Sequence, residues 1–169
     1  MRFKIVPNGA NLYHGSPHKF NKFSTDNIGS GEGNQSFGWG LYFTDNKGIA
    51  EHYADIGNTV NHAHMKNAGD SRNLYNINLT SSDGHDFDFL SWYDAVGPEQ
   101  QHKIKQQALV ENLTDRWGAS VRDVERYPNS IPFSTGESGA DIYHKLQSEW
   151  SMTPKEASMF LSRAGVDGI

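Results

Sequence analysis

Apolar and polar residues alternate in the segment RNLYNINLT. Tyr75, Ile77 and Leu79 would lie on one face of an extended chain, with the asparagines between them on the other face. Alternation with a period of two is typical of a strand that has one buried face. We therefore predict a half-buried strand in this segment, and shorter strands over residues 12–15 and 40–43.

The C-terminal part of the chain shows the three- and four-residue spacing of a helix instead. Ala157, Phe160, Leu161 and Ala164 recur at this spacing. The Thr-Pro-Lys-Glu just before them is a capping box with proline at the first helical position. Further polar and apolar patterns predict helices over 47–56, 98–113, 139–150 and 153–164, and loops over 17–38 and 57–71.

The predicted helix over 47–56 follows the tripeptide Thr-Asp-Asn, in which every residue can act as an N-cap. Its spacing would place Ile49, Ala50 and Tyr53 on a buried face. In the next predicted helix, a solvated face is the simplest interpretation of four glutamines, at positions 100, 101, 106 and 107.

The composition narrows the class of protein. A length of 169 residues suits a single domain over residues 1–169. The net charge of −5, without a cluster of Lys and Arg, argues against stable nucleic-acid binding, which needs a basic surface. There is no cysteine and no apolar run that could cross a membrane, so we expect a cytoplasmic protein. His62 and His64 have no third ligand nearby, which predicts no metal site.

Two short motifs combine glycine with a side chain that can bind a ligand. In Tyr-His-Gly-Ser, Gly15 behind His14 lets a flat ligand approach the backbone, whose N–H and C=O groups can pair with a carboxamide. In Gly-Trp-Gly-Leu-Tyr-Phe, Gly40 again permits close approach and Tyr42 offers a stacking face. Tyr53 follows on the predicted inner helix face, as a second wall of the same slot. Taken singly, the histidine also fits a satisfied core residue and the first tyrosine a strand core residue.

With these motifs, the chain resembles ADP-ribosyltransferases of the His-Tyr-Glu branch, which includes diphtheria toxin and the poly(ADP-ribose) polymerases. Four segments are similar, in order, to the ADP-ribosyltransferase domains of large polyvalent proteins of phages and mobile elements: LYHGSPHKFNKFSTDNIGSGEG, GWGLYFTDN, TGESGADIYHKLQSEW and KEASMFLSRAGVDGI. The resemblance implies an α+β fold in which two small β-sheets pack against each other, flanked by helices, with NAD in the cleft between them.

The resemblance also implies roles for individual residues. His14 would hydrogen-bond ribose hydroxyls of NAD, and Gly15 would hold the nicotinamide carboxamide through its backbone. Ser16 would lie near the adenine-side ribose. Tyr42 would stack on the nicotinamide, and Tyr53 would form the second aromatic wall. NAD is then a co-substrate, and no metal is implied.

The glycines between these motifs take their expected roles from the same resemblance. Gly29, Gly31 and Gly33 would form a flexible loop beside the pocket, and their backbone amides are candidates for contacts with the diphosphate. Gly38 and Gly40 would let the strand that follows pass close to the nicotinamide ring.

The chain departs from the family pattern at two points. In relatives, the ending Gly-Val-Asp-Gly-Ile continues into a strand that carries the catalytic acid. We therefore expect this domain to lack its C-terminal strand or strands, because the chain was cut, because the sequence continues further, or because the protein is a natural NAD-binding remnant. Ala50 stands where polymerase-like members have a serine that bonds the carboxamide. Glu137 is a candidate replacement acid, but its position before a predicted helix favours a capping role.

The activity that the resemblance implies is transfer of ADP-ribose from NAD to a macromolecular acceptor, a host protein, during phage or mobile-element conflict. Two alternatives stay open. One is a catalytically inactive NAD-binding or protein-interaction module, and the other is an NAD glycohydrolase that gives the ribosyl group to water. A nucleic-acid acceptor also stays open, because a transferase needs to hold a base only transiently.

Overall fold

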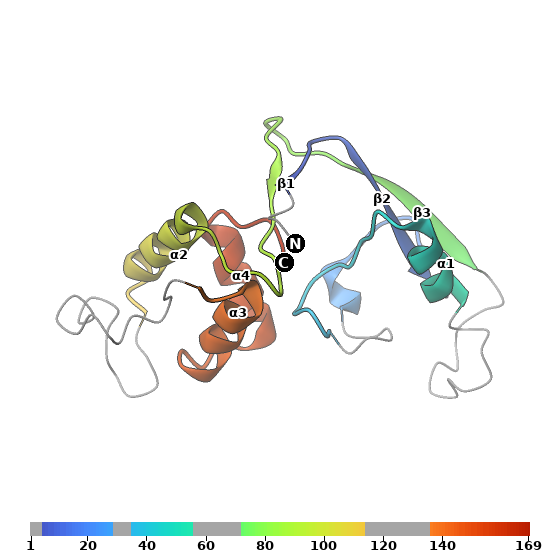
Figure 1. Cartoon of the computed structure of the whole chain (residues 1–169). Coiled ribbons are helices and arrows are strands. Elements are labelled where there is room, and N and C mark those ends of the chain that lie inside the picture. The colour runs from blue at the N-terminus through green and yellow to red at the C-terminus, as the bar shows by residue number, and fades with distance from the viewer. Residues whose placement is uncertain (1–4, 29–34, 56–71, 114–135) are drawn as a thin grey trace. The chain divides into compact units, whose positions relative to one another are not determined.

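Helices and strands both occur in this protein, consistent with the predicted α+β class (Figure 1). The computed structural model describes residues 5–28, 35–55, 72–113 and 136–169, which fall into two compact units. Unit 1 comprises Met1–Val6, Gly29–Gly40 and Asp86–Ile169, and unit 2 comprises Pro7–Ile28 and Leu41–His85. Several predictions fall outside the described residues, namely the loop over 57–71 with His62 and His64, and the roles of Gly29, Gly31 and Gly33.

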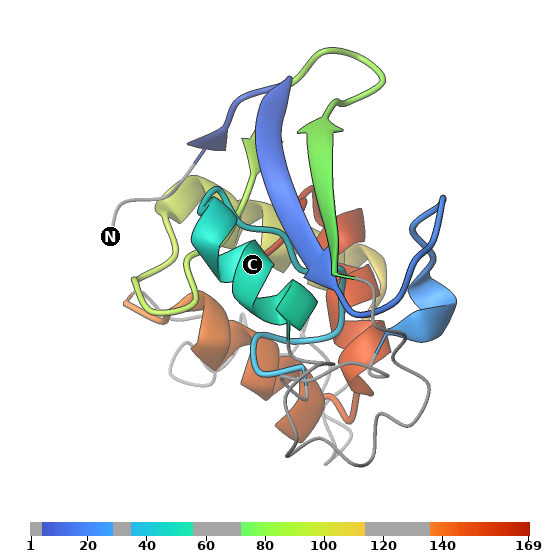
Figure 2. The same cartoon turned by 90° about the vertical axis from the view of Figure 1, so that its right-hand side faces the viewer.

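An antiparallel pair of strands runs through unit 2 (Figure 2). Strand β2 (Ala10–Ser16) pairs with β3 (Asn73–Leu79) along its whole length. Exposed and half-buried residues alternate along β3, with Tyr75, Ile77 and Leu79 on the more buried face. The period-two pattern therefore predicted this strand correctly, and β2 lies where the shorter strand over 12–15 was expected.

Helix α1 (Lys47–Asp55) packs on β2 within the same unit. It begins after Asn46, whose side-chain oxygen accepts a hydrogen bond from the N–H of Gly48 at 2.9 Å. This contact satisfies one of the free N–H groups of the first helical turn. Asn46 is thus the N-cap among the three candidates. The long predicted loop before the helix contains one turn of 3₁₀ helix, η1 (Thr25–Asn27).

The buried face of α1 differs from the prediction. Ala50 is buried as expected, but Ile49 and Tyr53 are 47% and 44% exposed, and Ala54 is buried instead. The physical reason is the short distance between the helix and β2, where Gly15 meets the backbone of α1. Only small side chains fit at such a contact, so the two alanines face the strand.

Residues 40–43 do not form the predicted strand. In this segment, the contact with β2 is a single bridge by the next residue, Thr44. It forms two backbone hydrogen bonds with Tyr13, at N–O distances of 2.7 and 3.0 Å. The C=O group of Tyr42 accepts a hydrogen bond from the side chain of His14 instead of a neighbouring strand. A side chain has thus taken the place of a ladder partner, and the chain then turns into α1.

Three helices build the core of unit 1 (Figure 1). They are α2 (Pro98–Val110), α3 (Gly139–Ser148) and α4 (Pro154–Arg163), and each confirms a helix that the sequence predicts. A second small sheet, of β1 (Ile5–Val6) and β4 (Phe87–Asp88), completes the unit. None of the helices that the structure describes is long and apolar enough to cross a membrane. The largest fully buried side chains are Phe160, Ile104, Ile142 and Leu146.

Both ends of α4 carry recognisable capping structures. At the start, the Thr153 hydroxyl accepts a hydrogen bond from the N–H of Glu156, whose carboxylate accepts one from the N–H of Thr153 at 2.7 Å. At the end, Gly165 has a φ of 80°, and the N–H of Val166 donates to the C=O of Leu161 at 3.0 Å. This is a Schellman motif, which needs a left-handed residue and therefore favours glycine.

The last residues of the chain run beside the segment that follows β4. Gly168 forms a parallel bridge with Phe89, and its C=O accepts a hydrogen bond from the N–H of Leu90 at 2.9 Å. The N–H of Asp167 donates to the C=O of Asp88 at 2.9 Å. The ending Gly-Val-Asp-Gly-Ile therefore forms backbone hydrogen bonds with residues 88–90.

The glutamines of α2 do not all lie on a solvated face. Gln100 and Gln101 are only 7% and 5% exposed, whereas Gln106 is exposed. The Gln100 amide donates hydrogen bonds to the carboxylate of Asp88 and, at 3.5 Å, to the C=O of Phe89. A buried amide is stable only with such partners, so this end of α2 is held by polar contacts with β4.

An ion pair connects the end of α2 to α4. Both carboxylate oxygens of Glu111 accept hydrogen bonds from the Arg163 guanidinium, at 2.7 and 3.0 Å. These bonds hold the pKa of Glu111 below its ordinary value of 4.5, although partial burial opposes the shift. A depressed carboxyl pKa stabilises the fold above the unfolded value, and the stabilisation is lost as the pH falls through the folded value.

We therefore expect Glu111→Gln to lower the free energy of unfolding at pH 7 by at most about 1 kcal/mol, since Arg163 is half exposed. The difference from the parent should shrink as the pH falls below 4.5. Thermal melts of both proteins at neutral and acid pH measure this difference in stability. Glu99→Gln is the matched control, because that carboxylate is 87% exposed and 3.7 Å from Lys103. A difference between parent and Glu111→Gln that persists in acid would contradict the role of the ion pair.

Candidate functional site

His14 in β2 is held by the backbone of the segment that precedes α1. Its Nδ1 atom lies 2.8 Å from the C=O oxygen of Tyr42. A carbonyl oxygen only accepts hydrogen bonds, so Nδ1 carries a proton, which makes Nε2 the acceptor nitrogen whenever the ring is neutral. Among the described residues, none donates a hydrogen bond to Nε2. The histidine therefore offers an acceptor for a hydroxyl group.

Aromatic rings fix the orientation of this imidazole. Among the described residues, ring centroids lie 5.2 Å away for Phe23, 5.9 Å for Phe20, 6.0 Å for Phe43 and 6.2 Å for Tyr75. Phe23 meets the His14 ring edge-on, at 81°. Packing on this scale restricts the rotation of a side chain, so the direction of Nε2 is set before any ligand binds.

Tyr75 of β3 contacts the start of the loop after β2 through hydrogen bonds and ring stacking. Its hydroxyl accepts a hydrogen bond from the N–H of Phe20 at 2.7 Å and donates one to the C=O of His18 at 3.2 Å. The Tyr75 and Phe20 rings stack with centroids 4.2 Å apart and planes 14° apart. The sequence interpretation did not find these residues, although two phenylalanines within a polar loop were a usable signal.

Gly15 allows α1 to lie directly on β2. A Cβ atom at this position would be 1.7 Å from the C=O oxygen of Ala50 and 2.7 Å from the N atom of Ala54. Both are backbone atoms of α1, which a side-chain rotation cannot move. The contact explains why position 15 is glycine without any need for a ligand.

The backbone of Gly15 is nevertheless placed to bind one. In an antiparallel strand, the N–H and C=O groups of alternate residues point to opposite edges. Tyr13 directs both of its groups to Thr44, away from β3. Gly15, two residues further on, therefore directs its N–H and C=O to the same edge, where no described residue hydrogen-bonds them. A donor and an acceptor side by side match a carboxamide.

The remaining predicted site residues have different environments. Ser16 is buried, and its hydroxyl accepts a hydrogen bond from the N–H of His18 at 3.1 Å, which closes a turn at the end of β2. Tyr42 and Tyr53 are 40% and 44% exposed in unit 2. Gly40 belongs to unit 1, and a Cβ atom there would meet nothing within 4 Å. The structure thus joins Tyr42 to His14, and gives Ser16 a local structural contact.

A family model described as ADP-ribosyltransferase in polyvalent proteins matches residues 8–126, more than half of the chain. The chain belongs to this family. The resemblance predicted from the sequence is thereby confirmed, and ADP-ribosyltransferases use NAD as their co-substrate. The matched range contains both motifs of the predicted site, together with α1 and α2, while α3 and α4 lie beyond it. No curated protein and no solved structure matches the chain significantly.

Two other residues of this member of the family have structural contacts. Glu137, the candidate replacement acid, lies directly before the N-cap of α3, and its carboxylate forms an ion pair with Lys145. Gly38 has a φ of 97°, and a Cβ atom there would be 2.9 Å from the Tyr143 ring. In the part of the chain that the structure describes, no group of three or more His, Asp or Glu residues is arranged to hold a metal ion.

Proposed function

We propose that this chain transfers ADP-ribose from NAD to a host protein, in the conflict between phages or mobile elements and their hosts. The observation that carries the proposal is the fixed imidazole of His14 beside the backbone N–H and C=O groups of Gly15, which no described residue hydrogen-bonds. One group offers an acceptor to a ribose hydroxyl, and the other offers a donor and an acceptor to the carboxamide. Membership of the family supports the reaction class. The biological setting is proposed from the resemblance to polyvalent proteins of phages and mobile elements.

In this reaction the bond between nicotinamide and its ribose breaks, and a nucleophile of the acceptor forms a new bond to the same ribose carbon. Nicotinamide leaves with the electron pair of the broken bond. The transition state resembles that of glycoside hydrolysis, with positive charge on the ribose. The contribution of His14 and Gly15 is to hold both sides of the breaking bond in a fixed geometry, which lowers the entropic part of the barrier.

The test uses the chain with NAD labelled on its adenylate phosphate, with and without a host-cell lysate. The proposal predicts release of nicotinamide together with transfer of the label to protein. Release of nicotinamide without labelled protein would favour the glycohydrolase. Binding of NAD without release of nicotinamide would favour an inactive binding module. A chain that does not bind NAD at all would refute the proposal.

Tyr42→Ala tests the stacking role separately from the contact with His14. The substitution keeps the C=O group that accepts from the imidazole and removes only the aromatic ring. We expect the Kd for free nicotinamide to rise about fivefold, because a stacked ring contributes on the order of 1 kcal/mol. Calorimetric titration measures it. The matched control is Tyr93→Ala in unit 1, whose ring is 76% exposed. Equal nicotinamide binding by parent and Tyr42→Ala would exclude Tyr42 from the site.

A further inference from the structure

The outer edge of strand β3 has no hydrogen-bonding partner among the described residues. In an antiparallel pair, alternate residues direct their N–H and C=O groups to opposite edges. Tyr13 is the β2 partner of Asn76 and bonds Thr44 on the side away from β3, so Asn76 in turn directs its groups away from β2. Leu74 and Asn78 lie two residues to either side of Asn76 and point the same way, and no described residue hydrogen-bonds their backbone groups.

This edge is exposed and uncharged. Leu74, Asn76 and Asn78 are all exposed, and β3 contains no charged residue and no proline. Edge strands of natural proteins commonly carry such residues or are covered, because a row of unpaired backbone groups readily pairs with another strand. In Figure 2, β3 (green) forms one side of the pair, and α1 (teal) lies along β2 (blue). The Asn78 side chain donates to the C=O of Gly9 at 2.8 Å, toward the β2 side, and so does not cap the edge.

A further strand at this edge would add to a small sheet. The sheet of β2 and β3 has two strands, and such a pair is marginally stable unless a helix or more strands support it. Helix α1 packs on the face that contains Gly15. The other face carries Leu12, Ile77 and Leu79, which are only half buried. Strands added at the edge would extend this apolar face.

We propose that the edge of β3 pairs with β3 of a second copy of this chain, in antiparallel orientation, with the twofold axis at Asn76. This axis places Leu74 opposite Asn78 of the copy, so that all residues of β3 have a partner. The pairs that face outward each exchange two hydrogen bonds. On the apolar face, Tyr75 lies opposite Ile77 of the copy, an aromatic and β-branched pair of the kind that stabilises sheets.

The sequence of β3 favours a second copy over a strand of another protein. A twofold interface brings one surface patch against itself, so the patch must be self-complementary. The pattern of apolar and polar residues in Asn-Leu-Tyr-Asn-Ile-Asn-Leu places like faces together about Asn76. Although the chain as a whole carries a net charge of −5, β3 is neutral, and no like charges meet at the axis.

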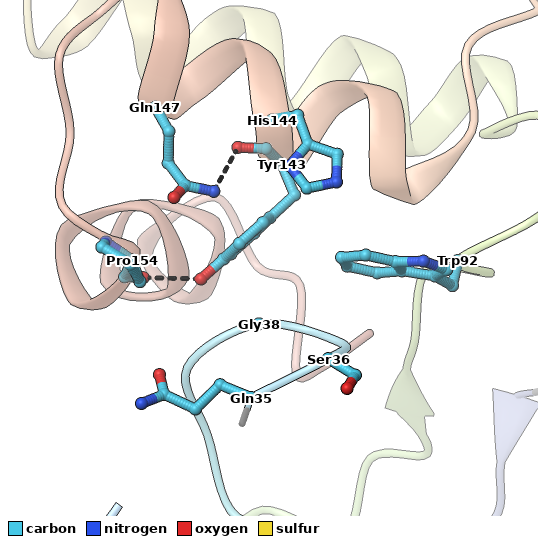
Figure 3. A pocket seen from close by; sticks show the side chains of 8 residues that line it. All are labelled: Gln35, Ser36, Gly38, Trp92, Tyr143, His144, Gln147 and Pro154. Atoms are coloured by element: carbon cyan, nitrogen blue, oxygen red, sulfur yellow. Dashed lines mark hydrogen bonds between the residues drawn. The ribbon is translucent and has the colours of Figure 1, made fainter. Parts of the chain in front are cut away.

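Single-cysteine variants test the pairing, because the chain has no cysteine of its own. The Cα atoms of a hydrogen-bonded pair are about 5.5 Å apart, a distance that a disulfide can span. Asn76→Cys should therefore form a disulfide-linked dimer in oxidised glutathione, at least about tenfold faster than Leu74→Cys, whose two copies would be displaced by about 14 Å along the strands. His144→Cys is the control for random collision, at an exposed position of α3 beside the pocket of unit 1 that Figure 3 shows.

Asn76→Pro measures the pairing without a cross-link. The N–H of Asn76 points to the outer edge, so proline removes no hydrogen bond to β2 and suits an edge strand. In sedimentation velocity, this variant should stay monomeric at concentrations at which the parent forms dimers. Circular dichroism must show the variant to be folded, and the cysteine comparison alone decides where it is not.

Two results would overturn the proposal. One is a parent chain that stays monomeric at millimolar concentration, which would leave the edge to a strand of another protein. The other is an Asn76→Cys chain that cross-links no faster than Leu74→Cys or His144→Cys. Neither measurement involves NAD, so the pairing of two copies and the transferase activity can fail independently.

Discussion

Replacing Gly15 by alanine is expected to destabilise the protein strongly, although the change adds only one methyl group. The new Cβ atom would stand 1.7 Å from the C=O oxygen of Ala50, inside the contact distance of any two atoms. Since the obstacle is the backbone of α1, the helix must move away from β2. We expect the free energy of unfolding to fall by about 3 kcal/mol, and Tm by about 6–12 °C in a chain of this length.

Gly40→Ala is the matched control for this experiment. A Cβ atom at Gly40 meets nothing within 4 Å, so the same substitution there should change the stability by less than about 1 kcal/mol. Thermal melts of the three proteins give the comparison. If Gly15→Ala melted with the parent and only its NAD binding fell, the glycine would serve ligand approach, as the sequence first indicated, and not the packing of α1.

The strongest loss of activity is expected for His14→Ala. The substitution removes the Nε2 acceptor, and it also leaves a gap among the rings of Phe20, Phe23, Phe43 and Tyr75. We expect NAD affinity to fall at least about tenfold and the rate of nicotinamide release about 10²-fold, because a displaced substrate loses the advantage of orientation. Calorimetry and chromatography of released nicotinamide measure the two effects.

A second substitution separates the two functions of this imidazole. The amide nitrogen of His14→Asn can still donate to the C=O of Tyr42, as Nδ1 does, but nothing replaces Nε2. It should therefore lose less stability than His14→Ala does, because it keeps the hydrogen bond to Tyr42, while losing NAD affinity to a similar extent. His18→Ala is the matched control, since that side chain is exposed. NAD binding and turnover that are unaltered in His14→Ala would remove this residue from the site.

Patterns of a few neighbouring residues predicted most of the elements correctly. The capping box at Thr153 and Glu156 lies within one turn of chain, and so does the Asn46 cap of α1. Helical and period-two spacing likewise depend only on residues close in sequence. Such signals describe local structure, which the rest of the chain modifies little.

The predicted strand over residues 40–43 and the buried face of α1 were wrong for a common reason. Each depended on a partner distant in the chain. The Tyr42 C=O group is taken by His14, twenty-eight positions earlier, and the small residues of α1 face Gly15 of β2. The predicted exposure of Gln100 was wrong for the same reason. Its amide is buried because it donates hydrogen bonds to Asp88 and to the backbone of Phe89.

Residue types and their spacing were enough to predict the strands β2 and β3, the four helices, and His14, Gly15 and Tyr42 as candidate site residues. The family was predicted from the resemblance of whole segments to known ADP-ribosyltransferases. The folded chain was needed to learn which nitrogen of His14 the Tyr42 C=O group contacts, that Gly15 serves the packing of α1, and that Phe20, Phe23 and Tyr75 lie around the imidazole. These two sets of findings differ because residue type and spacing reflect only local conformational preferences. Hydrogen-bond direction, close backbone contact and ring packing exist only after residues distant in the sequence have come together.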